Sequence, residues 1–367
     1  MIIKDISLKN YRNYENININ FNDHINIISG KNGQGKTNLL ESLVYLSLTR
    51  SHRINDDKKL IRYDQPFAKL TTNIQTKDKE YNLQAIIHDK GKSLFINDIP
   101  MKKTSDFIGI LNVILFSPDD LFLFNDLPRE RRKLVNQEIT KVNKKYLLAL
   151  NEFQNLLKDR NNLLKKDNID ENYLNVIDEK MIEDEVIIIE ERNIFIQTIN
   201  EYISSIYKEI SNEEIDIEIE YKCCIENLKD IRNNLKNLYI NSREKDYEYH
   251  VTTEGIHHED IIFKMNEQPI TQIASQGQKR MIMLSFKLAL VEYIKNNIHE
   301  EPTLLLDDVL SELDDIHQRN LLNKLNKGKQ CIITTTEIHK FDGMNFKEYE
   351  IENGKIKGGM QWVKKKK

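Results

Sequence analysis

Glycine and proline are scarce in this chain of 367 residues, which contains 12 glycines and 6 prolines. Neither residue occurs anywhere between Arg129 and Glu254. Because tight turns depend on these two residues, their scarcity excludes collagen-like, flexible-linker and turn-rich β-sandwich architectures. A long stretch without helix breakers instead favours long helices.

Cysteine is also rare, and the chain lacks long apolar runs. Its three cysteines (Cys223, Cys224 and Cys331) form no CxxC pair and no recognised metal-ligand spacing, which favours a reducing compartment. No stretch approaches the length of a membrane span, and the N-terminal residues contain no apolar targeting segment. We therefore expect a cytoplasmic protein without a membrane partner. The net charge of −4 excludes a polycation but permits a local basic surface.

Hydrophobic periodicity divides the chain into three parts. Residues 2–10 and 16–28 alternate apolar and polar side chains and predict two strands, and residues 69–99 predict several short strands. Residues 135–163 and 182–210 repeat apolar side chains at helical spacing, with Arg160 and Asn193 as the polar exceptions. The pattern predicts an antiparallel helical hairpin, although two helices of an ordinary bundle would look the same.

Strand patterns return after Glu254, so one α/β domain is predicted to be split by a helical insertion. The expected domains are residues 1–128, 129–254 and 255–367. The first and third would be two halves of one domain, and the second would be a helical arm.

A glycine-rich motif follows the predicted strand that ends near residue 28. Glycines let such a loop wrap phosphate groups with its backbone N–H groups pointing inward, while a lysine reaches the β- and γ-phosphates and a threonine holds Mg²⁺. The motif has the form GxxxxGK[ST] and consists of Gly30, Lys31, Asn32, Gly33, Gln34, Gly35, Lys36 and Thr37. It predicts a site for a nucleotide such as ATP with Mg²⁺.

Two further motifs fit the same site when taken together. Residues 303–306 are an apolar run that ends in Asp307 and Asp308. Asp307 is expected to complete the Mg²⁺ site with Thr37, and Asp308 to polarise the attacking water. The stretch SQGQK, with Ser275, Gly277 and Gln278, precedes a long helix and predicts an anion site at its N-terminus.

The order of these motifs resembles the ABC-type ATPase heads of the SMC/Rad50 group and, within that group, the RecF family of bacterial recombination and gap-repair ATPases. Further matching stretches are LKNYRNY (8–14), TRSHR (49–53), LFSPDDL (115–121), PRERRK (128–133), SQGQKR (275–280), LLLDDVLSELD (304–314) and ITTT (333–336). The resemblance implies an α/β fold, an ABC-type P-loop ATPase head with a mixed sheet, flanking helices and an N-terminal antiparallel β part, split by a mainly helical arm.

The resemblance also implies a mechanism. In ABC-type heads, two copies enclose two ATP molecules, so Ser275, Gly277 and Gln278 of one copy would act on ATP bound by Lys36 and Thr37 of the other. Asp314 would lie across that interface. Similar proteins are slow, DNA-stimulated ATPases that dimerise with ATP on single-stranded and gapped duplex DNA and cooperate with RecR and RecO.

The chain departs from the family pattern in three places. Asp308 stands where most ABC ATPases have glutamate, and its shorter side chain is consistent with slow hydrolysis. Thr335 or Thr336 stands where ABC proteins have a switch histidine, and neither Glu337 nor His339 is expected to replace it. The family's GPHRDD stretch is here GIHHED, residues 255–260.

DNA contacts are the least defined part of the sequence prediction. Basic clusters around residues 50–62 and 129–133 could neutralise phosphates, although a solvated charged surface explains them equally well. The candidates are Arg53, Arg129, Arg131 and Arg132. Arg12 and Tyr14 are expected near the nucleotide, with burial in the core as the alternative for Tyr14.

Two other functions remain to be considered. The ATPase subunit of a different ABC or SMC machine, including a membrane transporter, would share the glycine-rich motif and the SxGQ signature. However, a transporter subunit normally carries the catalytic glutamate and histidine and lacks a helical hairpin. A scaffold with a degenerate ATP site would not be expected to retain Lys36, Thr37 and Asp307.

Overall fold

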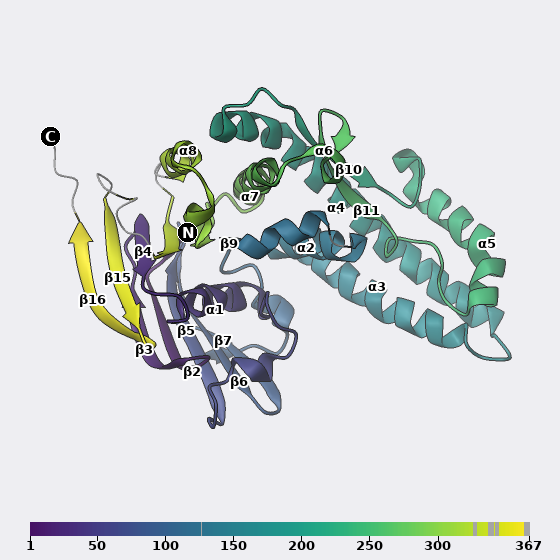
Figure 1. Ribbon diagram of the computed structural model, residues 1–367. Helices are drawn as coiled ribbons and strands as arrows, with labels where there is room; N and C mark the ends of the chain where they lie inside the picture. The colour runs from purple at the N-terminus through teal and green to yellow at the C-terminus, as the bar shows by residue number, and fades with distance from the viewer. Residues whose placement is uncertain (126, 326–328, 337–340, 342–344, 363–367) are drawn as a thin grey trace. The chain divides into compact units, whose positions relative to one another are not determined.

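The computed structural model describes residues 1–125, 127–325, 329–336, 341 and 345–362 (Figure 1). The chain forms two compact units. The first contains Met1–Leu121, Ser205–Glu214 and Arg280–Lys367, and the second contains Phe122–Ser204 and Ile215–Lys279. Two helices, α4 (Glu171–Ser211) and α7 (Gln276–Ile298), cross from one unit into the other.

An antiparallel sheet forms the N-terminal part of the first unit. Its strand order is β3-β2-β5-β6-β7-β8, and β1 pairs with β5. The strands are β1 (Ile2–Ile3), β2 (Asp5–Tyr11), β3 (Tyr14–Asn20), β5 (Phe67–Gln75), β6 (Glu80–His88), β7 (Gly91–Ile96) and β8 (Ile99–Pro100). Burial alternates along β5, which indicates that the sheet is covered on one face.

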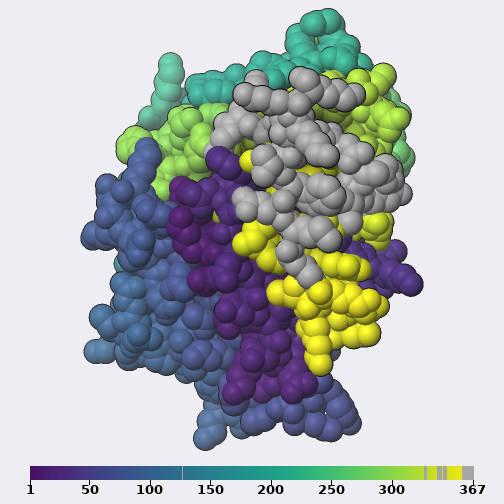
Figure 2. Space-filling view, turned by 90° about the vertical axis from the view of Figure 1, so that its left-hand side faces the viewer, coloured from purple at the N-terminus to yellow at the C-terminus, as the bar shows by residue number. Residues whose placement is uncertain are grey.

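A six-stranded sheet forms the rest of the framework, in the order β16-β15-β4-β14-β13-β9. Its strands are β4 (Ile25–Ser29), β9 (Val113–Phe116), β13 (Thr303–Asp307), β14 (Cys331–Thr335), β15 (Phe346–Glu352) and β16 (Lys355–Trp362). Only β16 is antiparallel to its neighbour. Because β4 lies between β14 and β15, segments from the two ends of the sequence are neighbours, as the purple and yellow surfaces of Figure 2 show.

Helix α1 (Lys36–Leu48) joins the two sheets into one core. It contacts β9, β13 and β14 of the six-stranded sheet and β6 of the antiparallel sheet. Nearly all its residues are buried, which explains why its sequence, KTNLLESLVYLSL, has no wide polar face. The unit also contains α8 (Asp315–Leu325) and the 3₁₀ segments η1 (Asp57–Leu60), η2 (Thr104–Asp106) and η5 (Val309–Glu312), while η3 (Pro118–Phe124) crosses its boundary.

The second unit is mainly helical. It contains α2 (Pro128–Val142), α3 (Lys144–Leu163), most of α4, η4 (Leu228–Asp230), α5 (Ile231–Tyr249) and the short α6 (Ile270–Ile273). A small antiparallel sheet, β10-β11-β12, completes it with β10 (Ile217–Lys222), β11 (Asp260–Met265) and β12 (Gln268–Pro269). Helix α4 is long because its sequence contains neither glycine nor proline.

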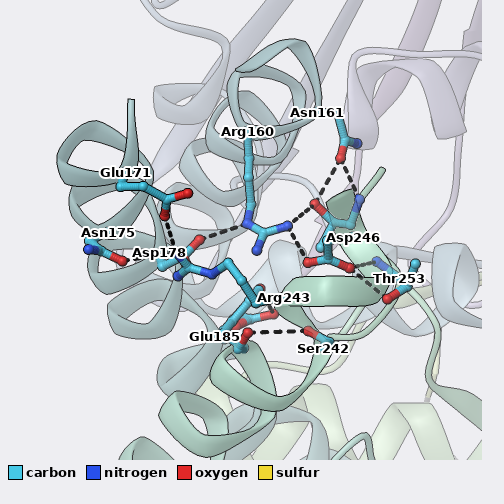
Figure 3. A network of polar contacts seen from close by, with 12 residues as sticks. Arg160, Asn161, Glu171, Asn175, Asp178, Glu185, Ser242, Arg243, Asp246 and Thr253 are labelled. Atoms are coloured by element: carbon cyan, nitrogen blue, oxygen red, sulfur yellow. Dashed lines mark hydrogen bonds and ion pairs between the residues drawn. The ribbon is translucent and has the colours of Figure 1, made fainter. Parts of the chain in front are cut away.

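A buried charge network holds the helices of this unit together (Figure 3). Arg160 on α3 is fully buried, and its Nε donates to Asp178 Oδ1 on α4 at 2.7 Å. Its Nη1 donates to Asp246 Oδ2 on α5 at 2.7 Å and to Thr252 Oγ1 at 2.8 Å. The polar exception in the apolar pattern of α3 therefore links three helices.

Two predicted elements differ from the structure. The strand expected over residues 16–28 is two strands of different sheets, β3 and β4, because Asn22 and Asn26 form a polar turn in which Asn26 Nδ2 donates to Asn22 O. The first arm helix is interrupted at Asn143, whose side chain accepts a hydrogen bond from Tyr146 N and caps α3.

The compact units also divide the chain differently from the expected boundaries at 128 and 254. Residues 255–279 belong to the mainly helical unit because β11 pairs with β10 along its whole length. The three-domain division stays a prediction. The predicted fold class is confirmed, as the protein is a mixed α/β structure with an antiparallel N-terminal sheet and a mainly helical part. Within the described residues, none of the helices combines the length and hydrophobicity that a membrane span needs.

Replacing Arg160 with methionine should strongly destabilise the second unit. Asp178 keeps its ion pair with Arg243, but the change leaves the buried carboxylate of Asp246 without its arginine, a loss of about 3–5 kcal/mol. Urea unfolding, monitored by the circular dichroism signal of the helices, measures this loss in the free energy of unfolding. Arg232→Met is the matched control, because Arg232 makes exposed ion pairs with Glu179 and Glu183 and should cost at most about 1 kcal/mol. Equal losses in the two variants would contradict the central role of Arg160.

Candidate nucleotide-binding site

The loop between β4 and α1 has a backbone shape that requires glycine. Gly30, Gly33 and Gly35 have φ angles of 146°, 78° and 110°. A Cβ atom on Gly30 would lie 2.4 Å from Ile351 O, and one on Gly35 would lie 2.5 Å from Asn13 Nδ2. The glycines therefore allow both the left-handed conformation and the close approach of neighbouring strands.

Two turns outside the motif support this loop. Tyr14 is buried, and its hydroxyl donates to Gly35 O at 2.8 Å, while Asn13 Nδ2 donates to Gln34 O at 2.9 Å. From the turn between β15 and β16, Asn353 N donates to Gln34 Oε1. The loop is thus anchored by contacts within the chain itself. Tyr14 belongs to the core, the alternative that the sequence left open.

Lys36, the lysine of the motif, is buried beneath the loop. Its Nζ donates to Gly30 O at 2.7 Å and to Lys31 O at 3.2 Å. Burial lowers the pKa of Lys36, and the carboxylates of Asp308 and Asp307 oppose that shift. A buried ammonium held by loop carbonyls is suited to exchange these contacts for phosphate oxygens.

The carboxylate of Asp307 joins the loop to the end of β13. Its Oδ1 accepts hydrogen bonds from Thr37 Oγ1 at 3.0 Å and from Thr334 Oγ1 on β14 at 2.7 Å. Burial raises the pKa of Asp307, and the hydroxyl groups of Thr334 and Thr37 oppose the rise. The hydroxyl of Thr37 beside this carboxylate is the hard-oxygen donor set that Mg²⁺ prefers.

Asp308 adopts a left-handed conformation with a φ of 53°. Its N–H donates to Thr334 Oγ1 at 2.9 Å, which fixes the backbone at this point. Among the described residues, its buried Oδ1 has no hydrogen-bond partner. A buried carboxylate oxygen that lacks a donor needs a water or a cation, so the residues at this end of the sheet fit a hydrated Mg²⁺.

A charged pair that the sequence motifs did not predict borders the site. The Arg12 guanidinium donates to both oxygens of Glu41 on α1, at 2.9 and 2.8 Å, rather than reaching free into the site. Arg53, a candidate for DNA contact, lies in the same group, with its Nη1 3.2 Å from Asn38 Oδ1. The positive charge of Arg53 lowers the pKa of Asp307 and so partly offsets the rise caused by burial. A role for Arg53 on DNA stays a prediction.

The signature residues begin α7, and Ser275–Lys279 belongs to the second unit. Ser275 Oγ accepts from Gln278 N at 3.2 Å, and Gln278 Oε1 accepts from Ser275 N at 3.0 Å. This reciprocal pair is a capping box, and both Ser275 and Gly277 are exposed. The helix start is therefore ordered by its own side chains and accessible to a ligand.

The other predicted DNA contacts have different environments. Arg131 donates to both oxygens of Asp260, at 2.8 and 2.9 Å, and Arg132 donates to Glu259 O. Arg129 is exposed. Two of the three arginines on α2 thus have structural partners, and their contacts with DNA stay predictions.

One important residue was not singled out from the sequence. Thr334 contacts both acidic residues of the site, whereas the sequence drew attention to the following threonines, Thr335 and Thr336. The signal was present in the ITTT stretch, but strand register decides which hydroxyl faces Asp307. Glu337 and His339 lie outside the described residues.

Gly30→Ala should lower stability more than Gly33→Ala. Both positions have positive φ, so each substitution carries a backbone cost of about 1–2 kcal/mol. Only the Gly30 substitution adds a clash with Ile351 O, since nothing lies within 4 Å of a Cβ on Gly33. Thermal and urea unfolding compare the variants. Equal midpoints would show that β15 does not pack against the loop as described.

Comparisons with known proteins agree with this geometry. The family model described as the RecF/RecN/SMC N terminal domain matches residues 2–353. The DNA replication and repair protein RecF of Oceanobacillus iheyensis is 37% identical, over 92% of this chain and 94% of that protein. The RecF of Bacillus pumilus is 36% identical, over 96% of this chain and 97% of that protein.

Solved structures extend the agreement to the fold. A structure of the recombination mediator protein RecF with ATP in the RecFOR pathway is 31% identical and has a TM-score of 0.90, covering 99% of this chain and 98% of that chain. An Smc head domain from Pyrococcus furiosus has a TM-score of 0.59 at 17% identity and shares the fold. Together, the motif geometry and these matches show that the chain belongs to the RecF family of RecF/RecN/SMC-type ATPases.

Proposed function

We propose that this protein is an ATP-dependent DNA-binding protein of recombinational and replication-gap repair, in which ATP joins two copies of the chain on DNA. The observation that carries the proposal is the contact of Thr37 and Thr334 with Asp307, beside the buried Lys36. This contact brings the two nucleotide motifs together in the arrangement that phosphoryl-transfer sites use. Relatives described as RecF with ATP support the choice of nucleotide.

Each residue of the site has a proposed role. Lys36 and the loop N–H groups of residues 30–35 bind the phosphates, and Thr37 and Asp307 hold Mg²⁺, which neutralises charge on the phosphate oxygens. Asp308 orients the attacking water through its Oδ1, which has no hydrogen-bond partner in the described part of the chain. Because an aspartate reaches less far than a glutamate, we propose slow hydrolysis, which DNA stimulates by stabilising the closed dimer.

The signature completes the site from a second copy. Ser275 and Gly277 are exposed at the start of α7, where the helix N-terminus favours an anion. We assign Ser275, Gly277 and Gln278 to the γ-phosphate of ATP bound by the partner copy. Asp314 follows in the same interface, and its Oδ1 accepts from Ile316 N and His317 N at the start of α8. The relatives' RecFOR pathway makes RecR and RecO the proposed protein partners.

ATP should convert the monomer to a dimer, and Ser275→Arg should abolish this change without preventing ATP binding. The introduced arginine would block the approach of one copy to ATP bound by the other. Lys36→Met instead would remove ATP binding by the copy that carries the substitution. Light scattering with and without Mg·ATP measures the mass, and the ATP-induced shift in melting temperature measures binding. Thr271→Arg, at an exposed position on the preceding helix, is the matched control.

Three results would contradict this arrangement. If ATP left the mass of the wild type unchanged, nucleotide-driven dimerisation would be excluded. Alternatively, Ser275→Arg could dimerise normally, which would leave the signature without a role in trans. Loss of ATP binding in the Ser275 variant would also argue against it, because the capping box lies outside the phosphate loop.

We assign Arg129 to DNA phosphate contact because it is exposed, whereas Arg131 and Arg132 bond to Asp260 and Glu259. Arg129→Ala should weaken binding to gapped duplex and reduce the slope of log affinity against log salt by about 1. Fluorescence anisotropy at several salt concentrations, with ATP, measures both quantities. Arg232→Ala, an exposed arginine on α5, is the control. An unchanged salt slope would exclude Arg129 from the DNA surface.

A further inference from the structure

Three side chains with metal-binding atoms meet at one end of the β10–β11 pair in the second unit. The thiols of Cys223 and Cys224 and a carboxylate oxygen of Glu259 all lie within 4.8 Å of one another. The antiparallel register pairs Lys222 with Asp260, which places the cysteines after β10 beside the glutamate before β11. The sheet therefore fixes residues that are distant in sequence.

Glu259 is oriented toward the two cysteines by the rest of its contacts. Its Oε2 accepts hydrogen bonds from Nη1 of the buried Arg192 and from the hydroxyl of the half-buried Tyr221. Its Oε1 accepts from Cys223 Sγ at 3.2 Å and from Cys224 N at 3.1 Å. One carboxylate oxygen is thus anchored by donors, and the other is presented to the thiol groups.

A second carboxylate lies near the same cluster. Glu185 is fully buried, and its Oε1 accepts from Tyr239 hydroxyl and Ile256 N. Among the described residues, its Oε2 has no partner. Burial first, and then the charge of Glu259, raises the pKa of Glu185 to about 8, and Glu185 in turn contributes to the raised pKa of Cys224.

We propose that Cys223, Cys224 and Glu259 bind a thiophilic divalent cation of the Zn²⁺ type. In a tetrahedral Zn²⁺ site, Zn–S bonds of about 2.3 Å and a Zn–O bond of about 2.0–2.2 Å place neighbouring ligand atoms about 3.5–3.8 Å apart, which the cluster reaches with small side-chain movements. The cysteines are half-buried, so the ion has access from solvent, and a water molecule fills the fourth position.

The binding step balances in charge and in protons. The cation replaces the S–H protons of both cysteines, forming two metal–sulfur bonds and one metal–oxygen bond and releasing two protons. Two thiolates and Glu259 then carry three negative charges. The divalent cation and the Arg192 guanidinium carry three positive charges, so the buried group is neutral as a whole.

Cadmium binding to the reduced full-length protein tests the site. The probe is Cd²⁺ alone, titrated while the thiolate-to-cadmium absorption in the ultraviolet and the release of protons are recorded. We expect one Cd²⁺ per chain, about two protons released per ion, and displacement of the ion by Zn²⁺. The double variant Cys223→Ser/Cys224→Ser should lose the absorption, whereas Cys331→Ser, which removes the buried thiol of β14, should retain it.

The folding of the variants is checked separately. Circular dichroism and the melting temperature without metal establish that the double variant is folded, and the single variant Cys223→Ser gives a second, milder change. Zn²⁺ should raise the melting temperature of the wild type and leave that of the double variant unchanged. Absence of the thiolate absorption in the wild type, or its persistence in the folded double variant, would overturn the proposal.

Discussion

A single oxygen atom organises the candidate nucleotide site. Asp307 Oδ1 accepts hydrogen bonds from Thr37, the second residue of α1, and from Thr334 on the neighbouring strand. Thr334 also accepts the N–H of Asp308 and so fixes the left-handed turn that presents the second carboxylate. The phosphate loop, the acidic strand and its neighbour therefore hold one another in place. Burying a carboxylate costs free energy that the two hydroxyl donors offset only in part, so a cation bound at this position would be stabilising.

The sequence predicted those parts of the site that are continuous along the chain. The loop from Gly30 to Thr37 and the strand that ends at Asp307 can be recognised because each motif is a local pattern with a local structural reason. Contacts between distant segments could not be predicted. Thr334, for example, is one of three consecutive threonines, and only the strand register determines that its hydroxyl lies beside Asp307. The same holds for Arg160. The sequence marks it as a polar exception in an apolar pattern, but its partners Asp178 and Asp246 lie on two other helices and could not be predicted.

Several arginines of this protein form ion pairs inside the fold rather than on its surface. Arg160 and Arg192 are buried and paired with carboxylates, and Arg131 bonds to Asp260. A count of basic residues therefore overestimates the basic surface available to nucleic acid. In the PRERRK stretch, for example, Arg131 and Arg132 bond to Asp260 and Glu259. The buried pairs give up hydration and in return help to set the positions of the helices that they connect. This use of charge is consistent with a chain whose net charge is only −4.

The position of β4 between β14 and β15 has a consequence for synthesis on the ribosome. Ser29 and Glu348 are hydrogen-bonded neighbours although 319 residues separate them. At about 5–20 residues per second, translation of that interval takes roughly 15–60 s. During this time the apolar strand INIIS has neither of its final neighbours, and an unpaired apolar edge invites aggregation. The nascent antiparallel sheet can form early and supply the contacts of Asn13 and Tyr14 with the glycine-rich loop, but the contact from Asn353 is added last.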